Sequence, residues 1–346
     1  MSRFLQLHLL TFFPPANLNR DDTGRPKTAV VGGATRLRLS SQALKRAWRT
    51  SEVFTTALAG HMGQRTQRLG EVVLEHLLAG GMEQAKAQEV ARDIAGVFGK
   101  VKDTRDPKPA RIEQLAFISP EERAAALALA DRALAGEQVE AKSAGLLRAA
   151  DTAADIALFG RMLAADPDYN REAAAQVAHA ITTHKVLVED DYYTAVDDLK
   201  TPAEDAGAGF LGEAAFGSGV FYLYLCVDKA LLLKNLGGDA ALAATALSAL
   251  AEAAATVAPR GKQNSFAAHG RAHYVLAERG DRQPRTLAGA FARPVSGEDL
   301  MAQSIEALER FRTELDAAYG PAADVTARME VGKSGSLRDI IAFCRS

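Results

Sequence analysis

The first apolar residues of the chain alternate with polar ones. The alternating run is Leu5, Gln6, Leu7, His8 and Leu9. A period of two is typical of a strand with one buried face, so the pattern predicts a half-buried first β-strand. Residues 14–39 are rich in Pro, Gly, Asn and Asp, and they predict a long structured loop after this strand.

Apolar positions are spaced by three and four after residue 40. Leu44, Ala47 and Trp48 share one face of a helix at this spacing. Ser40, which directly precedes the pattern, is a suitable N-cap because its hydroxyl can accept a hydrogen bond from the first turn. The sequence therefore predicts a helix that begins at residue 40 or 41.

Helical periodicity then continues from about residue 60 to 165, with a break at the Asp-Pro-Lys-Pro sequence of residues 106–109. This alanine-rich block predicts a helical insertion. Strand-like patterns return at residues 184–190 and 218–228. The intervening segment is polar, acidic and glycine-rich, and its length indicates a functional loop rather than a simple connection.

A further helix is predicted over residues 240–257, ending before Pro259, and strand-like stretches follow at residues 264–269 and 273–278. Without the insertions, the order is strand, helix, strand, strand, helix, strand. This order predicts an α+β fold of the ferredoxin-like or RRM-like kind. The arrangement is widely used to bind RNA, but it hosts many other functions, so it assigns no role by itself.

The composition fits one large domain with insertions or two domains, with 346 residues, 48% of them apolar and 24% charged. Cys226 and Cys344 form neither a disulfide framework nor a zinc site by themselves, which favours a reducing cytoplasm. The N-terminal apolar run lacks a small-residue cleavage site, and no window holds the about 18 apolar residues that a membrane span needs. We therefore expect a cytoplasmic protein without a membrane partner.

Cations are concentrated near the N-terminus. Residues 20–49 contain eight basic and two acidic side chains, a local charge of +6, although the whole chain has a formal net charge of −2. The basic residues are Arg20, Arg25, Lys27, Arg36, Arg38, Lys45, Arg46 and Arg49. A block of one sign indicates an anionic partner, and nucleic acid is the commonest kind.

The helix predicted after Ser40 places its polar and basic residues on the face opposite Leu44 and Trp48. These residues are Gln42, Lys45, Arg46 and Arg49. The helix N-terminus near Ser40 offers backbone N–H groups to a phosphate, and the preceding loop adds Arg20, Lys27 and Arg38. The alternative is a solvated helix face whose cations pair with acids elsewhere.

Two nucleotide-binding motifs fail their context tests. Residues 207–212 match G-x-G-x-x-G, but they follow a polar stretch instead of an apolar strand and lead into no predicted helix. Residues 260–265 contain a Gly-Lys pair but lack the other residues of a P-loop. Lys262 and Gln263 are nevertheless suitable for a phosphate contact in a turn.

Histidine and aspartate side chains gather between residues 179 and 198. They are His179, His184, Asp190, Asp191, Asp197 and Asp198. These residue types bind divalent metals, but their spacing matches no metal-binding frame, so a buried structural histidine and a solvated acidic loop are favoured and no metal is expected. Tyr192 and Tyr193 in the same segment can stack on bases, or one of them can anchor a core.

Seven stretches, in order along most of the chain, resemble the CasC family, the repeated backbone subunit of the type I-E Cascade complex of CRISPR immunity. They are NLNRDD (17–22), RLRLSSQALKRAWR (36–49), DIALFGRM (155–162), AHAITTH (178–184), YTAVDDL (193–199), FGSGVFY (216–222) and GKQNSFAA (261–268). From about residue 280 onward the match is loose.

The resemblance implies an RRM-like palm, a helical finger domain and a β-hairpin thumb. The corresponding segments are palm residues 1–58, finger residues 59–170, palm residues 171–190, thumb residues 191–217 and palm residues 218–346. Subunits of that family stack on CRISPR guide RNA as a helical backbone and hold the guide for pairing with target DNA. The implied partners are therefore guide RNA, target DNA through the guide, further copies of this chain and other Cascade subunits, with no cofactor.

The resemblance also implies roles for single residues. Those that look like contacts to the guide backbone are Arg20, Lys27, Gln42, Lys45 and Arg49. Met162 looks like the side chain that wedges against the bases, and Tyr192, Tyr193 and Thr194 look like the thumb tip at a displaced nucleotide. The Tyr-Tyr pair departs from the Trp-Phe type of pair expected in the family. Charge and position alone add Arg38, Ser40, Arg46, Lys262 and Gln263 to the RNA-binding candidates.

These inferences predict a non-catalytic RNA-binding scaffold that polymerises along guide RNA in antiviral defence. The alternative is a metal-dependent ribonuclease that uses Asp197 or Asp198 of the thumb. This alternative follows from related backbone proteins of other CRISPR types, which look able to cleave RNA with a thumb aspartate.

Overall fold

The computed structural model describes residues 2–163, 166–195 and 210–346. The chain forms two compact units. Unit 1 comprises Met1–Val53, Val177–Cys226 and Leu250–Ser346, and unit 2 comprises Phe54–Gln176 and Val227–Ala249. The boundaries given above for palm, fingers and thumb stay a prediction. Among the described residues, no helix is both long enough and apolar enough to cross a membrane.

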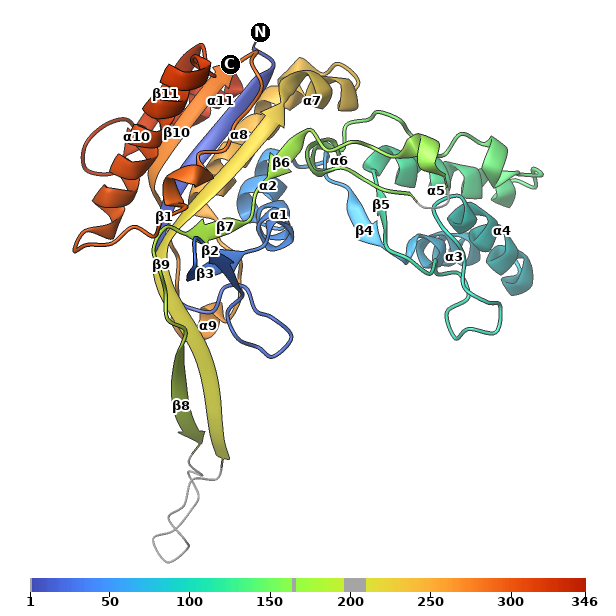
Figure 1. The fold of residues 1–346 in the computed structure, drawn as a ribbon. Coiled ribbons are helices and arrows are strands. Elements are labelled where there is room, and N and C mark those ends of the chain that lie inside the picture. The colour runs from blue at the N-terminus through green and yellow to red at the C-terminus, as the bar shows by residue number, and fades with distance from the viewer. Residues whose placement is uncertain (1, 164–165, 196–209) are drawn as a thin grey trace, which may run out of the picture. The chain divides into compact units, whose positions relative to one another are not determined.

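Unit 1 is built around a large sheet (Figure 1). Its strands are β1 (Phe4–Ala16), β2 (Thr28–Val31), β3 (Ala34–Leu39), β7 (Ala180–Thr182), β8 (Glu189–Ala195), β9 (Phe210–Asp228), β10 (Ala272–Gly280) and β11 (Val325–Glu330), with β6 (Ala175–Val177) at its boundary. Its helices are α1 (Ser41–Arg49), α9 (Gln263–Phe266), η3 (Ala288–Phe291), α10 (Leu300–Tyr319), α11 (Leu337–Arg345) and the end of α8 (Ala240–Thr256).

The strands follow the order β11–β10–β1–β9–β7–β3–β2 across the sheet. The neighbouring pairs β1/β10, β10/β11, β2/β3, β3/β7 and β7/β9 are antiparallel. Along the chain, β1, α1, β7, β9, α8 and β10 follow the predicted order of strand, helix, strand, strand, helix, strand. The predicted α+β class is therefore confirmed.

Both faces of the central strands are covered by helices. One face carries an apolar cluster to which η3 and α10 also contribute, made of Leu10, Val220, Tyr222, Tyr274, Leu276, Phe291 and Leu308. Phe221 and Leu223 point to the opposite face, because neighbouring residues of a strand alternate, and there they line a small cavity with Leu44 of α1 and Ala254 of α8. Residues 5–10 are consequently buried throughout, so the prediction of a half-buried strand is wrong.

Three other sequence predictions for unit 1 are wrong. Residues 14–39 contain the end of β1 and the β2/β3 hairpin instead of one loop, because Gly32 and Gly33 supply the positive φ angles of a tight turn. The strand predicted at 184–190 is displaced, since only its last two residues belong to β8. Residues 264–269 form most of the short helix α9 and a turn, not a strand.

Unit 2 is mostly helical. Its elements are α2 (Glu52–Ala57, which begins in unit 1), β4 (Gln64–Thr66), α3 (Leu69–Ala79), α4 (Gln84–Gly96), β5 (Ala116–Ile118), α5 (Pro120–Leu134), η1 (Ala141–Ser143), α6 (Ala154–Phe159), η2 (Pro167–Tyr169) and α7 (Lys229–Asn235). The buried residues of α3, α4 and α5 form one core, which confirms a helical block in this part of the chain. The prediction of helix throughout is wrong, because β4 and β5 pair as strands and irregular segments follow α4 and α5.

Candidate nucleic-acid interface

The basic loop between β1 and β2 is tied to the sheet and to α1 by two asparagines. Asn17 is buried, and its Nδ2 donates to the carbonyl oxygens of Gly24 and Ala215, both at 2.9 Å. The Oδ1 of Asn19 accepts the backbone N–H of Ser40 at 2.8 Å. These bonds hold the loop that carries Arg20 and Lys27 against the start of α1.

Helix α1 begins and faces the core as its sequence predicts. The Oγ of Ser40 accepts the N–H of Ala43 at 3.3 Å, so Ser40 is the N-cap. Leu44, Ala47 and Trp48 are buried. On the remaining surface Gln42 and Arg46 are exposed, whereas Lys45 and Arg49 are partly buried. Burial lowers the pKa of Lys45.

Two members of the basic block serve the protein itself. The buried guanidinium of Arg36 donates to the carbonyl oxygens of Thr182 and Phe291, at 2.8 and 3.0 Å. Arg25 forms an ion pair with Asp190 of β8, with 2.7 Å between Nη1 and Oδ1. The block therefore offers fewer cations to a ligand than the sequence count suggests.

Arg38 lies on β3 next to a histidine of the segment before β7. Its Nη1 is 2.8 Å from Nδ1 of His179, which must then accept the hydrogen bond. Burial lowers the pKa of His179, and the charges of Arg38 and Lys27 lower it further. The two cations thus lie near each other at this end of β3, and His179 contacts Arg38.

The loop after α8 approaches the β1–β2 loop closely. A Cβ at residue 261 would overlap the carbonyl oxygens of Asn17 and Leu18, so only glycine permits this approach. Lys262 follows with a left-handed backbone, φ 45°. The Nε2 of Gln263 lies 3.0 Å from Nδ1 of His269, which steadies the turn.

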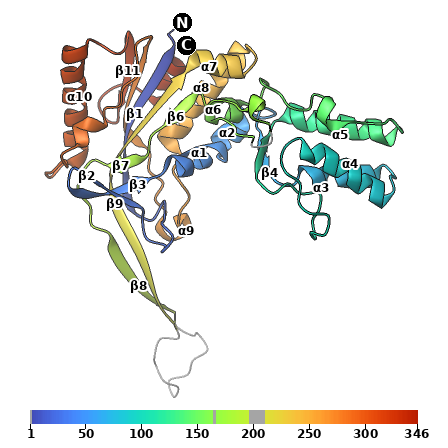
Figure 2. The same ribbon diagram turned by 45° about the vertical axis from the view of Figure 1, so that its right-hand side comes forward.

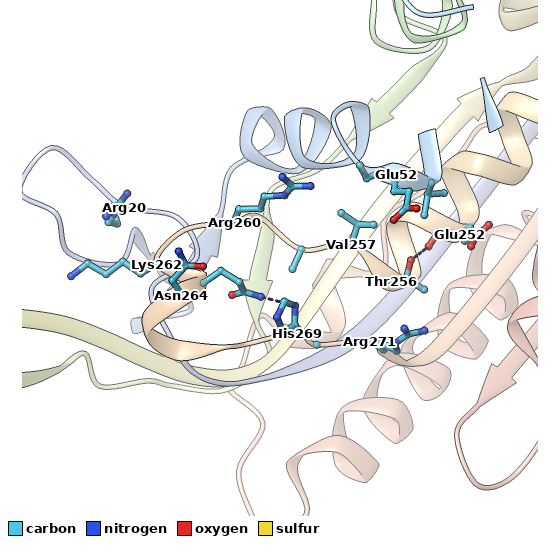
Figure 3. Close-up of a pocket in the computed structure, with 15 residues that line it drawn as sticks. Arg20, Glu52, Glu252, Thr256, Val257, Arg260, Lys262, Asn264, His269 and Arg271 are labelled. Carbon is cyan, nitrogen blue, oxygen red and sulfur yellow. Dashed lines mark hydrogen bonds between the residues drawn. The ribbon is translucent and has the colours of Figure 1, made fainter. Parts of the chain in front are cut away.

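These two loops line a polar cavity of about 840 Å³ (Figure 3). Its charged side chains are Arg20, Arg260, Lys262, Arg271, Glu52 and Glu252. Figure 3 places Arg20 and Lys262 at one end and the two glutamates at the other, with Arg260 between them. The sequence predicts Arg20, Lys262 and Gln263 here but misses Arg260, Arg271 and His269. Of these three residues, only Arg260 could have been found from the sequence, because it directly precedes Gly261 and Lys262.

The arms of β8 and β9 form a hairpin that extends beyond the other strands of the sheet (Figure 2). Tyr192 and Tyr193 are 68% and 49% exposed. Tyr193 lies opposite Gly212, where a Cβ would overlap its ring, and Thr194 lies opposite Leu211. The predicted stacking residues therefore stand on paired strands, whereas Asp197 and Asp198 lie outside the described residues.

Met162 belongs to unit 2, where it is 82% exposed. It follows Arg161, whose guanidinium is buried and lies 2.6 Å from the carboxylate of Glu122. The N–H of Leu163 donates to Oδ1 of Asn170 at 2.6 Å. An exposed apolar side chain is thus held between two anchored neighbours. Within the described ranges, no three His, Cys, Asp or Glu side chains are placed to hold a metal ion.

An antiparallel sheet with a cation-lined cavity and an exposed aromatic hairpin defines a candidate nucleic-acid-binding protein. The CT1975-like protein family matches residues 5–339, so the chain belongs to this family. One similar solved structure is a "CRISPR RNA-guided surveillance complex, pre-nicking", with 28% identity, 99% of this chain and 100% of that chain covered, and a TM-score of 0.85. Another is a "CRISPR RNA-guided surveillance complex", with 25% identity, 96% and 93% covered, and a TM-score of 0.73. No curated protein matches the chain.

Proposed function

We propose that this chain is a non-catalytic, RNA-binding backbone subunit of a CRISPR surveillance complex of the type I-E kind. The observation that carries the proposal is the cavity in which Arg20, Arg260 and Lys262 meet from loops far apart in sequence. Nearly the whole chain also resembles subunits of solved CRISPR RNA-guided surveillance complexes. The partners are guide RNA, target DNA through the guide, further copies of the chain and other subunits of the complex.

The palm of this subunit is RRM-like. The four strands β1, β7, β9 and β10 occur in the spatial order fourth, first, third, second, with α1 and α8 as the two connecting helices. The sequence strand, helix, strand, strand, helix, strand is that of ferredoxin-like folds, which supports the RRM-like assignment. The basic loop, the α1 surface and the cavity then form a path for the phosphate backbone.

The chemistry of these surfaces suits a guide of any sequence. Arginine and lysine contact phosphates without reading bases, and exposed tyrosines stack on any base. A protein with these parts holds an RNA strand by its backbone and leaves the base edges free for pairing with a target. Arg20, Lys27, Arg38, Gln42, Lys45, Arg46, Arg49, Lys262 and Gln263 are the backbone contacts in this proposal, next to the N-cap Ser40.

The first test is to purify the chain from cells that contain the rest of the system and to sequence the nucleic acid that accompanies it. We expect one class of short RNA with repeat-derived ends. The same preparation of an Arg260→Ala, Lys262→Ala double variant should retain less RNA, because two cations of the cavity are removed. Arg338→Ala, Lys333→Ala, at exposed positions outside the cavity, is the matched control. Protein free of nucleic acid, or equal retention by both variants, would contradict the proposal.

Absence of catalysis needs its own test, because Asp197 and Asp198 lie outside the described residues. The assembled complex is incubated with magnesium and a target RNA complementary to the guide. We expect intact RNA. Cleavage at even spacing that disappears in an Asp197→Asn, Asp198→Asn variant would establish the ribonuclease alternative instead.

A further inference from the structure

The base of the β8/β9 hairpin is the point at which β9 exchanges one partner strand for another. β9 pairs with β8 through its residues 210–216, and with β7 through Phe221 and Tyr222. Between these pairs β9 contributes the four residues 217–220, whereas the opposite chain contributes the six residues 183–188. Because the opposite chain has the longer segment, a regular ladder cannot continue through this interval.

His184 fills this interval with its ring. The backbone N–H of Val220 donates to Nε2 of His184 at 3.2 Å, and Nδ1 lies 3.0 Å from the carbonyl oxygen of Lys185. Nε2 therefore accepts a hydrogen bond and Nδ1 donates one, which requires a neutral ring with its proton on Nδ1. Burial lowers the pKa of His184 and the charge of Arg36 acts in the same direction, so both favour this neutral form.

The ring has this place because residue 219 is glycine. A Cβ on Gly219 would lie 2.6 Å from Nε2 and 2.9 Å from Cε1 of His184. Any side chain there would push the ring away from Val220. The glycine in the stretch FGSGVFY and the histidine at the end of AHAITTH therefore form one structural unit, although 35 positions separate them along the chain.

The backbone beside the ring is fixed by other bonds. The N–H of Thr183 donates to the carbonyl oxygen of Val220 at 2.8 Å, and the carbonyl oxygen of Thr183 accepts from Val295 at 2.9 Å. The Oγ1 of Thr182 donates to the carbonyl oxygen of His184 at 3.1 Å. Nε2 supplies the acceptor for the Val220 N–H, which lies in a buried residue and would be costly to leave without one.

We propose that His184 is a positioning residue for the β8/β9 hairpin. Its neutral imidazole takes the place of the missing carbonyl acceptor where β9 changes partner, and so fixes the direction in which the hairpin leaves the sheet. The hairpin is long relative to its base (Figure 1), so a small rotation there displaces Tyr192 and Tyr193 by a larger distance. The inference rests on the proposed function for one part alone, namely that these tyrosines contact RNA.

The test compares two substitutions in the full chain without RNA. His184→Gln keeps an oxygen near the position of Nε2, whereas His184→Leu keeps the approximate size of the ring and removes the acceptor. Hydrogen exchange is measured by mass spectrometry on peptides from residues 189–195 and 211–220, with β1 and β10 as internal reference. We expect about tenfold faster exchange of the hairpin arms in His184→Leu, as for the loss of one buried hydrogen bond, and restoration in His184→Gln.

Acidification provides a readout that packing alone would not produce. Protonation places a second donor against the Val220 N–H, so exchange of the arms, corrected for intrinsic rates, should accelerate in the wild-type chain below pH 6.5 but not in His184→Gln. Arg36 of β3 is the charged group that acts on the ring. β9 contributes the uncharged Val220, whose N–H faces Nε2. α10 contributes the uncharged Ser304, which is hydrogen-bonded to Thr183 beside the ring.

Two outcomes overturn the inference. The first is an unchanged exchange rate of the hairpin arms in His184→Leu. The second is an equal loss of protection in β1 and β10, which would mean that the ring stabilises the whole sheet. If His184→Leu does not fold, the ¹⁵N shifts of the His184 ring in the wild-type chain decide, because a ring protonated on Nε2 at pH 7 contradicts the proposed contact. RNA retention is measured in parallel. A wild-type chain that binds no RNA refutes the proposed function and leaves the exchange result intact.

Discussion

Lys45 of α1 is proposed to bind a phosphate of the guide, and this role can be tested with a single substitution. It is partly buried on the surface of the helix that carries Gln42 and Arg46. Lys45→Ala should weaken guide binding equally for all sequences and reduce the slope of log K against log salt by about 0.7, the value for one phosphate of a single strand. Filter binding at several salt concentrations measures this slope. Lys333→Ala is the control, and an unchanged slope in Lys45→Ala would return Lys45 to a solvated-surface role.

Gly261 determines the close approach of the two cavity loops. Gly261→Ala places a Cβ against the carbonyl oxygens of Asn17 and Leu18. We expect a loss of about 1–3 kcal/mol in unfolding free energy, as for other overpacked sites, together with weaker RNA binding. Chemical denaturation measures the first effect. Gly96→Ala is the matched control, because its Cβ would meet only a methyl group at 3.6 Å. Equal stability of the two variants would contradict the tight approach.

Glu278 should make the unfolding free energy of the chain depend on pH in the acid range. Burial raises the pKa of this carboxyl, but hydrogen bonds with His8 and Arg285 outweigh burial and lower it to about 2. A folded pKa below the ordinary 4.5 contributes stability that is complete above pH 4.5 and is lost as the pH falls toward 2. The unfolding free energy of the wild-type chain should therefore fall more steeply in this window than that of Glu278→Gln. Glu314→Gln, exposed on α10, should keep the wild-type slope, and three equal slopes would contradict the assignment.

The turn after α6 places a residue that stabilises the fold next to one that is proposed to contact RNA. Arg161 and Glu122 form a buried ion pair, whereas the adjacent Met162 is exposed. Arg161→Met should lower the unfolding free energy by about 3–5 kcal/mol, because it leaves a buried carboxylate unpaired. Met162→Ala should change it by less than about 0.5 kcal/mol and still weaken the hold on RNA. Urea denaturation and RNA binding of both variants check this, and a large stability loss in Met162→Ala would contradict it.

Elements were predictable where local pattern determines them. The helix starting near Ser40 follows from apolar spacing and a capping serine, and this cap is present. The sequence does not predict the β2/β3 hairpin, because its strands are only four and six residues long and lie in a segment rich in Pro, Gly, Asn and Asp. It predicts the paired arms of β8 and β9 only as a loop or hairpin. Their strand character depends on partners elsewhere in the chain, which no local pattern contains.

Many copies of the proposed backbone subunit should assemble along one RNA strand. Copies that stack head to tail make a heterologous, non-closing contact, so the assembly grows with the strand that it covers. Light scattering of complexes on single-stranded RNAs of increasing length should show protein mass rising in proportion to RNA length. One protein per RNA at every length would contradict the proposal. A duplex RNA of equal length is the control, because its bases are not accessible to the tyrosines.

Three properties follow from the amino-acid sequence alone: the mixed class of the fold, the start and buried face of α1, and the concentration of cations near residues 20–49. These properties depend on sterics, capping and the burial of residues a few positions apart, so they are local. The resemblance to CasC also rested on stretches of sequence, and the CT1975-like family match and the similar surveillance-complex structures agree with it at the level of CRISPR complexes.

Which of these residues meet depends on the folded chain. Arg260 and Arg271 line the same cavity as Arg20, because Gly261 allows two loops to approach closely. Arg36 and Arg25 make contacts within the protein. His184 accepts a hydrogen bond from Val220 at the base of the hairpin. Each of these contacts joins parts of the chain that are far apart in sequence. Strand register and close packing fix such contacts, and these are properties of the folded chain as a whole that no single segment carries.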